Sequence, residues 1–173
     1  MIRTTLAGMI LAMLIGPVLA LALPMQIPAS KWGQVSEGFQ MSGVAVGEVV
    51  GPGDPVLLEL TIKNVSKRVL TLKETAPWRD YELSVKDEKG KVARLTKEGE
   101  RLEKLRKDKE ELKVIFVKLS PGQEIQHTLR VTDIYQMLPG TTYLVTAKRR
   151  ISNQSATGAA EVVTNAVKIR VTA

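Results

Sequence analysis

The feature that most limits the fold of this chain is a two-residue periodicity of its apolar side chains. Val56, Leu58, Leu60 and Ile62 occupy every second position of one segment, and polar or charged residues stand between most of them. The same alternation recurs further along, at 83–85, 125–131, 143–147 and 167–171. Helical spacing fits none of these segments. Each one therefore predicts a β-strand with one face in a core.

Turn-forming sequences separate the predicted strands. Glycine supplies positive φ angles and proline presets φ, so both residue types favour reversal of the chain. They concentrate, with Asn, Asp and Ser, at 51–55, 64–67, 87–90, 120–122 and 138–140. Many short strands spaced in this way predict an all-β fold, an antiparallel immunoglobulin-like β-sandwich of about seven to eight strands. The turn at 87–90 is expected to close a hairpin between 81–86 and 91–96.

Two segments do not follow the strand pattern. In 97–113 every residue is charged except one glycine and three leucines, and Leu102 and Leu105 stand three positions apart. We expect a short charged helix here, and a mobile loop between strands is the alternative. The small polar residues of 152–160 predict a flexible connection between the last two strands.

The N-terminal residues have the organisation of a secretory signal peptide. Arg3 precedes an uncharged, mainly apolar run from Thr4 to Leu23, and the pair Gly16-Pro17 interrupts this run near its end. The sequence Ala20-Leu21-Ala22 then has the small residues that signal peptidase recognises, so we predict cleavage after Ala22. A retained membrane anchor is the alternative, because about 20 apolar residues can span a bilayer.

These features divide the chain into a signal peptide at 1–22, an N-terminal lead at 23–40 and one domain at 41–173. Trp32 and Phe39 are the expected anchors of the lead on the domain. The sequence contains no cysteine and has a formal net charge of +7. The first property excludes disulfides and thiolate chemistry, and the second favours association with anionic surfaces. We expect a periplasmic or secreted protein after cleavage.

The sequence contains no pattern of a known catalytic site. A phosphate-binding glycine loop, a Gly-x-Ser-x-Gly elbow and a His-Glu-x-x-His motif are all missing. His127 is the only histidine, and we interpret it as structural because catalytic and metal sites need several convergent groups. We therefore expect a non-enzyme without catalytic residues, metal or cofactor.

Four basic residues are the main candidates for ligand contact. Alternation places Lys148 and Arg150 on one face of a strand, and Lys168 and Arg170 on one face of the last strand. If the two strands pair, these residues predict a basic stripe for an anionic ligand, with an ordinary solvated face as the alternative. Trp78 is a possible contact anchor or a lid on the core.

The partner implied by this surface is a protein or an anionic polymer of the envelope. Nucleic acid is not expected, because export removes the usual targets and aromatic residues for stacking are scarce. The membrane is expected to be contacted only through an uncleaved signal peptide. The oligomeric state is left open.

A resemblance adds to the fold prediction. The residues that carry it are Leu60-Thr61-Ile62-Lys63-Asn64, Leu119-Ser120-Pro121-Gly122, Tyr135, Pro139-Gly140 and Tyr143-Leu144-Val145. In their order they resemble the non-catalytic β-sandwich domain of deuterolysin-like secreted metallopeptidases and of exported bacterial proteins. The resemblance implies the fold and not the activity, because the zinc-binding motif is missing. Tyr143 then resembles the tyrosine corner of such folds and is expected to be architectural.

Two functions follow as hypotheses. The first is an exported, non-enzymatic binding module that uses loops at one end of the sandwich. The alternative is a secreted proteinase inhibitor with an immunoglobulin-like fold, whose inhibitory loop would lie at 77–79 or within 97–113.

Overall fold

The computed structural model describes residues 32–108, 113–152 and 159–173 of the chain. The predicted signal peptide, its cleavage site and most of the predicted connection at 152–160 lie outside these residues. The described strands are β1 (Phe39–Ala45), β2 (Val49–Val50), β3 (Leu57–Asn64), β4 (Leu70–Glu74), β5 (Tyr81–Asp87), β6 (Ile115–Leu119), β7 (Glu124–Arg130), β8 (Thr142–Ser152), β9 (Ala159–Val163) and β10 (Val167–Val171). The described helices are α1 (Pro77–Asp80), α2 (Lys97–Lys107) and α3 (Val131–Ile134).

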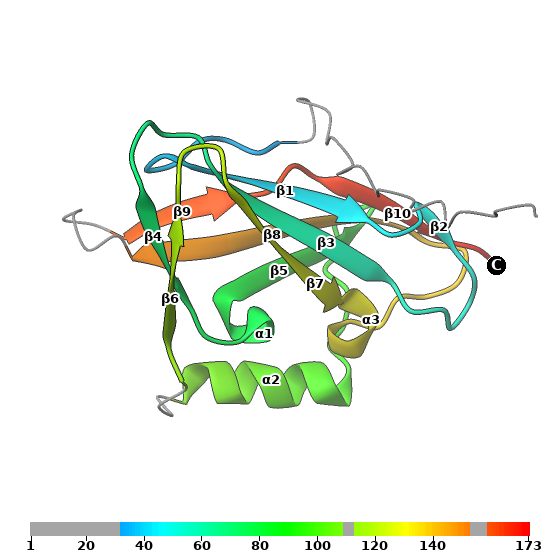
Figure 1. Ribbon diagram of the computed structural model, residues 1–173. Coiled ribbons are helices and arrows are strands. Elements are labelled where there is room, and N and C mark those ends of the chain that lie inside the picture. The colour runs from blue at the N-terminus through cyan, green and yellow to red at the C-terminus, as the bar shows by residue number, and fades with distance from the viewer. Residues whose placement is uncertain (1–31, 109–112, 153–158) are drawn as a thin grey trace, which may run out of the picture.

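The strands form three hydrogen-bonded groups. One sheet has the order β1-β3-β7, a second has the order β2-β10-β8-β5 with β9 also paired to β8, and β4 and β6 form a separate pair. All of these pairs are antiparallel except β2 with β10. The prediction of an antiparallel, mainly β structure with a short helix is thus confirmed for the described residues (Figure 1).

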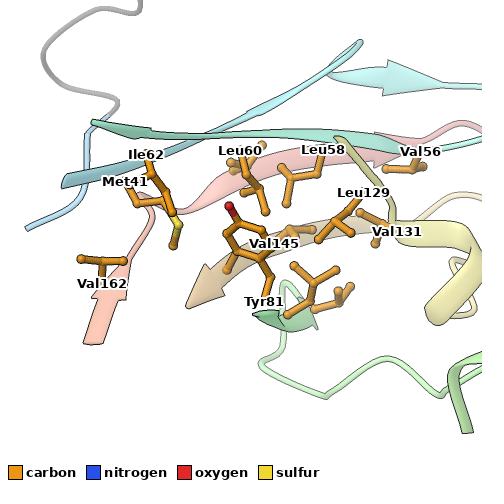
Figure 2. Close-up of a cluster of buried hydrophobic side chains, with 14 of the residues drawn as sticks. Met41, Val56, Leu58, Leu60, Ile62, Tyr81, Leu129, Val131, Val145 and Val162 are labelled. Carbon is orange, nitrogen blue, oxygen red and sulfur yellow. The ribbon is translucent and has the colours of Figure 1, made fainter. Parts of the chain in front are cut away.

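The hydrophobic core lies between the β1-β3-β7 sheet and the sheet that contains β5 and β8 (Figure 2). Leu58, Leu60 and Ile62 of β3 are fully buried, as their alternation predicts. They face Tyr81 of β5 and Val145 of β8 in the close-up. The two-residue period therefore identified the inward face of β3 correctly.

Tyr143 occupies the architectural position that we expected. Its ring is buried, and its hydroxyl accepts a hydrogen bond from the backbone N–H of Leu138 at 2.8 Å. This bond fixes the turn at 138–140 against the start of β8, as a tyrosine corner does.

The segment 97–113 contains the predicted short helix, because α2 covers its first eleven residues. The side chain of Thr96 caps the helix by accepting a hydrogen bond from the N–H of Gly99 at 2.9 Å. Gly99 is buried against α3, where an added Cβ would collide with the carbonyl group of Ile134. A glycine is needed at this position so that the two helices can pack closely. Residues 109–112 lie outside the described part.

The hairpin predicted at 87–90 forms only in part. The N–H of Asp87 donates a hydrogen bond to the carbonyl oxygen of Lys91 at 2.9 Å, which closes the turn as expected. The second arm, 91–96, is not a continuous strand, and it makes only isolated bridges from Val92 to Lys86 and from Leu95 to Tyr135. The chain leaves β5 here because Leu95 pairs with Tyr135 and the next residue caps α2.

The N-terminal lead is attached to the domain in the way that we predicted. Trp32 forms a bridge with Ser42, and Phe39 is fully buried. β1 begins at Phe39, so the last two residues of the predicted lead belong to the first strand of the sheet.

Candidate functional site

Arg149 is the centre of a buried ionic cluster. The alternation of β8 turns its side chain inward, in line with Ala147 and Ile151, and leaves it only 2% exposed. One guanidinium nitrogen, Nη1, donates to the hydroxyl of Tyr81 at 3.0 Å and to Glu74 at 3.3 Å. The buried charge therefore has a carboxylate partner, as a desolvated charge requires.

The other nitrogen of Arg149, Nη2, connects the cluster to β4 and α1. It donates to the carbonyl oxygen of Lys73 at 2.6 Å and lies 3.5 Å from a carboxylate oxygen of Asp80. One side chain on β8 thus contacts β4, α1 and β5 at the same time.

His127 extends this cluster from β7. Its Nδ1 lies 2.8 Å from the hydroxyl of Tyr81, and its Nε2 lies 3.4 Å from Glu74. Burial is the main cause that raises the pKa of Tyr81 to about 12, and the charge of Arg149 opposes it. The hydroxyl is therefore protonated at neutral pH, and it accepts from Arg149 and forms a hydrogen bond with Nδ1 of His127.

The structural role that we expected for His127 stays a prediction. Its ring contacts Tyr81 and a carboxylate that is shared with Arg149. In the described ranges no group of three or more His, Cys, Asp or Glu residues is placed to hold a metal ion.

Two arginines hold the short helix α1 from opposite sides. Arg149 contacts Asp80, whose carboxylate also accepts from the backbone N–H of Thr75 at 2.8 Å. Arg106 of α2 donates to the backbone carbonyl of Trp78, and to that of Tyr81 at 2.8 Å. α1 is therefore held between the sheet and α2 (Figure 1). These contacts fix the backbone that carries Arg79.

A hollow of about 400 Å³ opens beside α1 toward solvent. It is lined by four basic and two acidic residues, namely Arg79, Arg106, Lys148, Arg150, Asp80 and Glu82. Both acids already have cationic partners, since Asp80 lies beside Arg149 and Glu82 lies 3.3 Å from Lys148. We call this region the α1 hollow. Two of the basic residues also have acidic partners next to the hollow, since Arg106 lies 2.6 Å from Glu103 and Lys148 lies 3.8 Å from Glu161.

Arg106 contributes an unusual group to this region. Its Nε is buried and has no hydrogen-bond partner among the described residues. A buried donor without a partner is destabilising.

The structure separates the four residues of the predicted basic stripe into two pairs. β8 and β10 do pair, but Lys168 lies opposite Leu144 and Arg170 opposite Thr142. Lys148 lies opposite Val163 of β9 instead. Lys148 and Arg150 line the α1 hollow, whereas Lys168 and Arg170 line a second hollow that also contains Glu48 and Glu88. Binding of anions by these residues stays a prediction.

Trp78 lies in the helix α1, whereas the inhibitor hypothesis placed a loop at 77–79. Pro77 stands at the first position of α1, where its fixed φ favours helix formation. Trp78 is half-buried, and its carbonyl oxygen accepts from Arg106. The backbone of Trp78 thus has a structural role, and contact with a ligand stays a prediction.

Sequence reasoning missed Arg149, Arg79 and Arg106. The pattern that placed Lys148 and Arg150 outward also places Arg149 inward with Val145 and Ala147. A basic residue on an apolar strand face indicates buried acidic partners, so this cluster was detectable in principle. Arg79 and Arg106 belong to helices whose mutual packing no periodicity specifies.

The sequence matches no protein-family model and no curated protein. Three solved structures are similar to this chain at the level of the backbone. A β-glucosidase from Listeria innocua has a TM-score of 0.41 and 15% identity, with 80% of this chain and 16% of that chain covered. Spo0M, a sporulation control protein from Bacillus subtilis, has a TM-score of 0.41 and 15% identity, with 79% and 50% covered. The alkylpurine DNA glycosylase AlkC from Pseudomonas fluorescens has a TM-score of 0.36 and 13% identity, with 79% and 31% covered.

This chain therefore spans at most half the length of each of these three proteins, and the likeness is too low to carry a functional conclusion. The resemblance to the deuterolysin-like non-catalytic domain stays a prediction. None of the described helices has the length and hydropathy that a membrane span needs.

Proposed function

We propose that this chain is an exported, non-enzymatic binding module that holds an anionic partner in the α1 hollow. The observation that carries the proposal is the convergence of four basic side chains from α1, α2 and β8 on one solvent-facing hollow. The partner is an acidic protein segment or an anionic envelope polymer. In both, closely spaced carboxylate, phosphate or sulfate groups would meet the guanidinium and ammonium groups.

The rigidity of the hollow supports this proposal. Arg149 and Arg106 fix α1 through hydrogen bonds to its backbone and to Asp80. The cationic groups are therefore held near one another before a ligand arrives, which reduces the ordering cost of binding. Their summed field would also attract anionic partners from solution.

The immunoglobulin-like arrangement of two packed sheets is part of the same proposal. The antiparallel order β1-β3-β7, the facing sheet and the hydrogen bond from the N–H of Leu138 to Tyr143 support it. The signal-peptide features of residues 1–22 support export. The resemblance to the non-catalytic domain of deuterolysin-like enzymes agrees with a module that binds and does not catalyse.

The alternative, a proteinase inhibitor, gains no support from the two segments predicted to carry its loop. Residues 77–79 belong to α1, and the described part of 97–113 is mainly the helix α2. Within the described residues of both segments, we find no extended loop that a protease would accept as a strand.

The test compares two arginines on the outward face of the same sheet. Arg150→Glu changes the α1 hollow, and Arg170→Glu changes the second hollow, with the same change in net charge. Both side chains are exposed, so both variants should fold. We expect Arg150→Glu to lower the salt concentration that elutes the protein from a dextran sulfate matrix far more than Arg170→Glu does. Equal losses would mean that only net charge matters, and the proposal would be rejected.

A further inference from the structure

The strand β6 lies at a free edge. It is hydrogen-bonded to β4 on one side, and among the described strands no other pairs with it. A free edge presents unpaired N–H and C=O groups, which can accept another strand. This edge is distinct from the α1 hollow, because no residue of β6 lines that hollow.

The hydrogen bond from Arg149 shows which groups of β6 face outward. Lys73 of β4 lies opposite Phe116, and its carbonyl accepts from Arg149 of β8. The N–H and C=O of one residue in an antiparallel strand point to the same side, and the side alternates along the strand. Lys73 and Phe116 therefore form a non-hydrogen-bonded pair, so Phe116 and Lys118 direct their backbone groups to the free edge.

The side chains of this strand are unusually exposed for apolar residues. Val114, Ile115 and Phe116 are 39%, 48% and 59% exposed, although they follow one another in the chain. A strand with one face in the core should bury alternate residues. Packing within the described part of the chain therefore does not account for this run of apolar side chains.

Positive charge surrounds the exposed run. Lys113 precedes it, Lys118 follows it, and Lys73 lies opposite Phe116, all with exposed side chains. No acidic residue occurs between 113 and 119. A second copy that paired through β6 would bring like charges together, because each edge contributes only lysines. Lysines at a sheet edge are a known protection against self-association.

We propose that β6 binds an extended acidic segment of a partner protein, which adds to the β4–β6 pair as a third strand. Backbone groups of Phe116 and Lys118 would bond the incoming strand, and Ile115, on the other face of β6, would contact its apolar side chains. Its carboxylates would face Lys73 and Lys118, which share the face of Phe116. This site does not depend on the anionic ligand of the α1 hollow.

The probe is a blocked peptide of alternating glutamate and valine, titrated into the purified protein and followed by backbone NMR. We expect chemical-shift changes concentrated in β6. The same peptide with lysine in place of glutamate should bind at least about tenfold more weakly. A peptide N-methylated along one edge should lose affinity by about tenfold, as expected for the loss of one or two hydrogen bonds.

Two protein variants locate the site. Ile115→Ser and Lys118→Glu should each weaken peptide binding about tenfold, and thermal unfolding should confirm that both fold, since both side chains are exposed. Leu138→Ser is the matched control, because Leu138 is 62% exposed in a distant turn, and it should bind the peptide normally. Arg150→Glu should also leave peptide binding nearly unchanged, which separates this proposal from the α1 hollow.

Three results would overturn the proposal. The first is equal affinity for the N-methylated peptide, which would exclude strand pairing. The second is shift changes that lie away from β6. The third is sedimentation of the free protein as a dimer that Ile115→Ser dissociates, which would assign this edge to a second copy.

Discussion

The two faces of β8 carry arginines that have different roles. Arg149 is buried among Glu74, Asp80 and Tyr81, whereas its neighbour Arg150 is exposed and lines the α1 hollow. Because a strand alternates its faces, one residue of difference decides whether an arginine stabilises the interior or meets solvent. The inner face fixes the position of α1, and the outer face presents charge beside it. Charge alone therefore does not identify a binding residue.

The largest expected effect is the loss of the inner arginine. Arg149→Met should destabilise the protein by about 3–5 kcal/mol, because it leaves Glu74 and Asp80 without their buried partner. Chemical unfolding with urea measures this change.

Arg150→Met is the matched control on the outer face. It should change the free energy of unfolding by no more than about 0.5 kcal/mol, as surface substitutions usually do. Similar losses of unfolding free energy in the two variants would contradict the different roles assigned to the two faces of β8.

The second prediction concerns alkaline pH and the inner face. The pKa of Tyr81 is raised to about 12 by burial, so the folded protein holds this proton more tightly than the unfolded chain, where tyrosine has its usual pKa of about 10. Its contribution to stability is complete below pH 10 and is lost as the pH rises through 12. The loss should reach roughly 2–3 kcal/mol.

Tyr81→Phe isolates this contribution from that of the titrating lysines. Unfolding free energies of the variant and the parent protein are compared from pH 8 to pH 12. The variant should lose less stability over this range, and parallel curves would show that Tyr81 is not the group responsible.

The third prediction concerns Tyr143, which lies near the start of β8 on the same inner face. Tyr143→Phe should destabilise the protein by about 1–2 kcal/mol, because the N–H of Leu138 loses its 2.8 Å partner. Thermal unfolding by circular dichroism gives the change. An unaltered midpoint would remove Tyr143 from the tyrosine-corner role.

Alternation predicted the parts of the fold that depend on local pattern. It identified β3, β5, β7, β8 and β10 and the inward positions of β3, because each strand repeats its own period. It also implied that Arg149 points inward, opposite to Lys148 and Arg150. The charged run at 97–113 indicated α2 correctly, since its leucines have helical spacing.

The features that were not predicted from the sequence depend on contacts between distant segments. The separation of Lys148 from Lys168 follows from the register of β8 and β10, which no single strand encodes. The partners of Arg149 come from β4, α1 and β5, far away in the sequence. The free edge of β6 follows from the pairing of the strands. The apolar residues of β6 could therefore not be recognised as an exposed edge from the sequence alone.

The smallest expected effect is that of the outer ion pair between Lys148 and Glu82. Their atoms lie 3.3 Å apart, but the side chains are 36% and 56% exposed, so water screens the attraction. A double-mutant cycle with Lys148→Met and Glu82→Gln should give a coupling energy of about 0.2–1 kcal/mol. The matched cycle with Arg149→Met and Glu74→Gln should give a clearly larger coupling, because both groups are desolvated. Raising the salt concentration should reduce the first coupling and leave the second nearly unchanged. Equal couplings with equal salt dependence would mean that burial does not distinguish the two faces of β8.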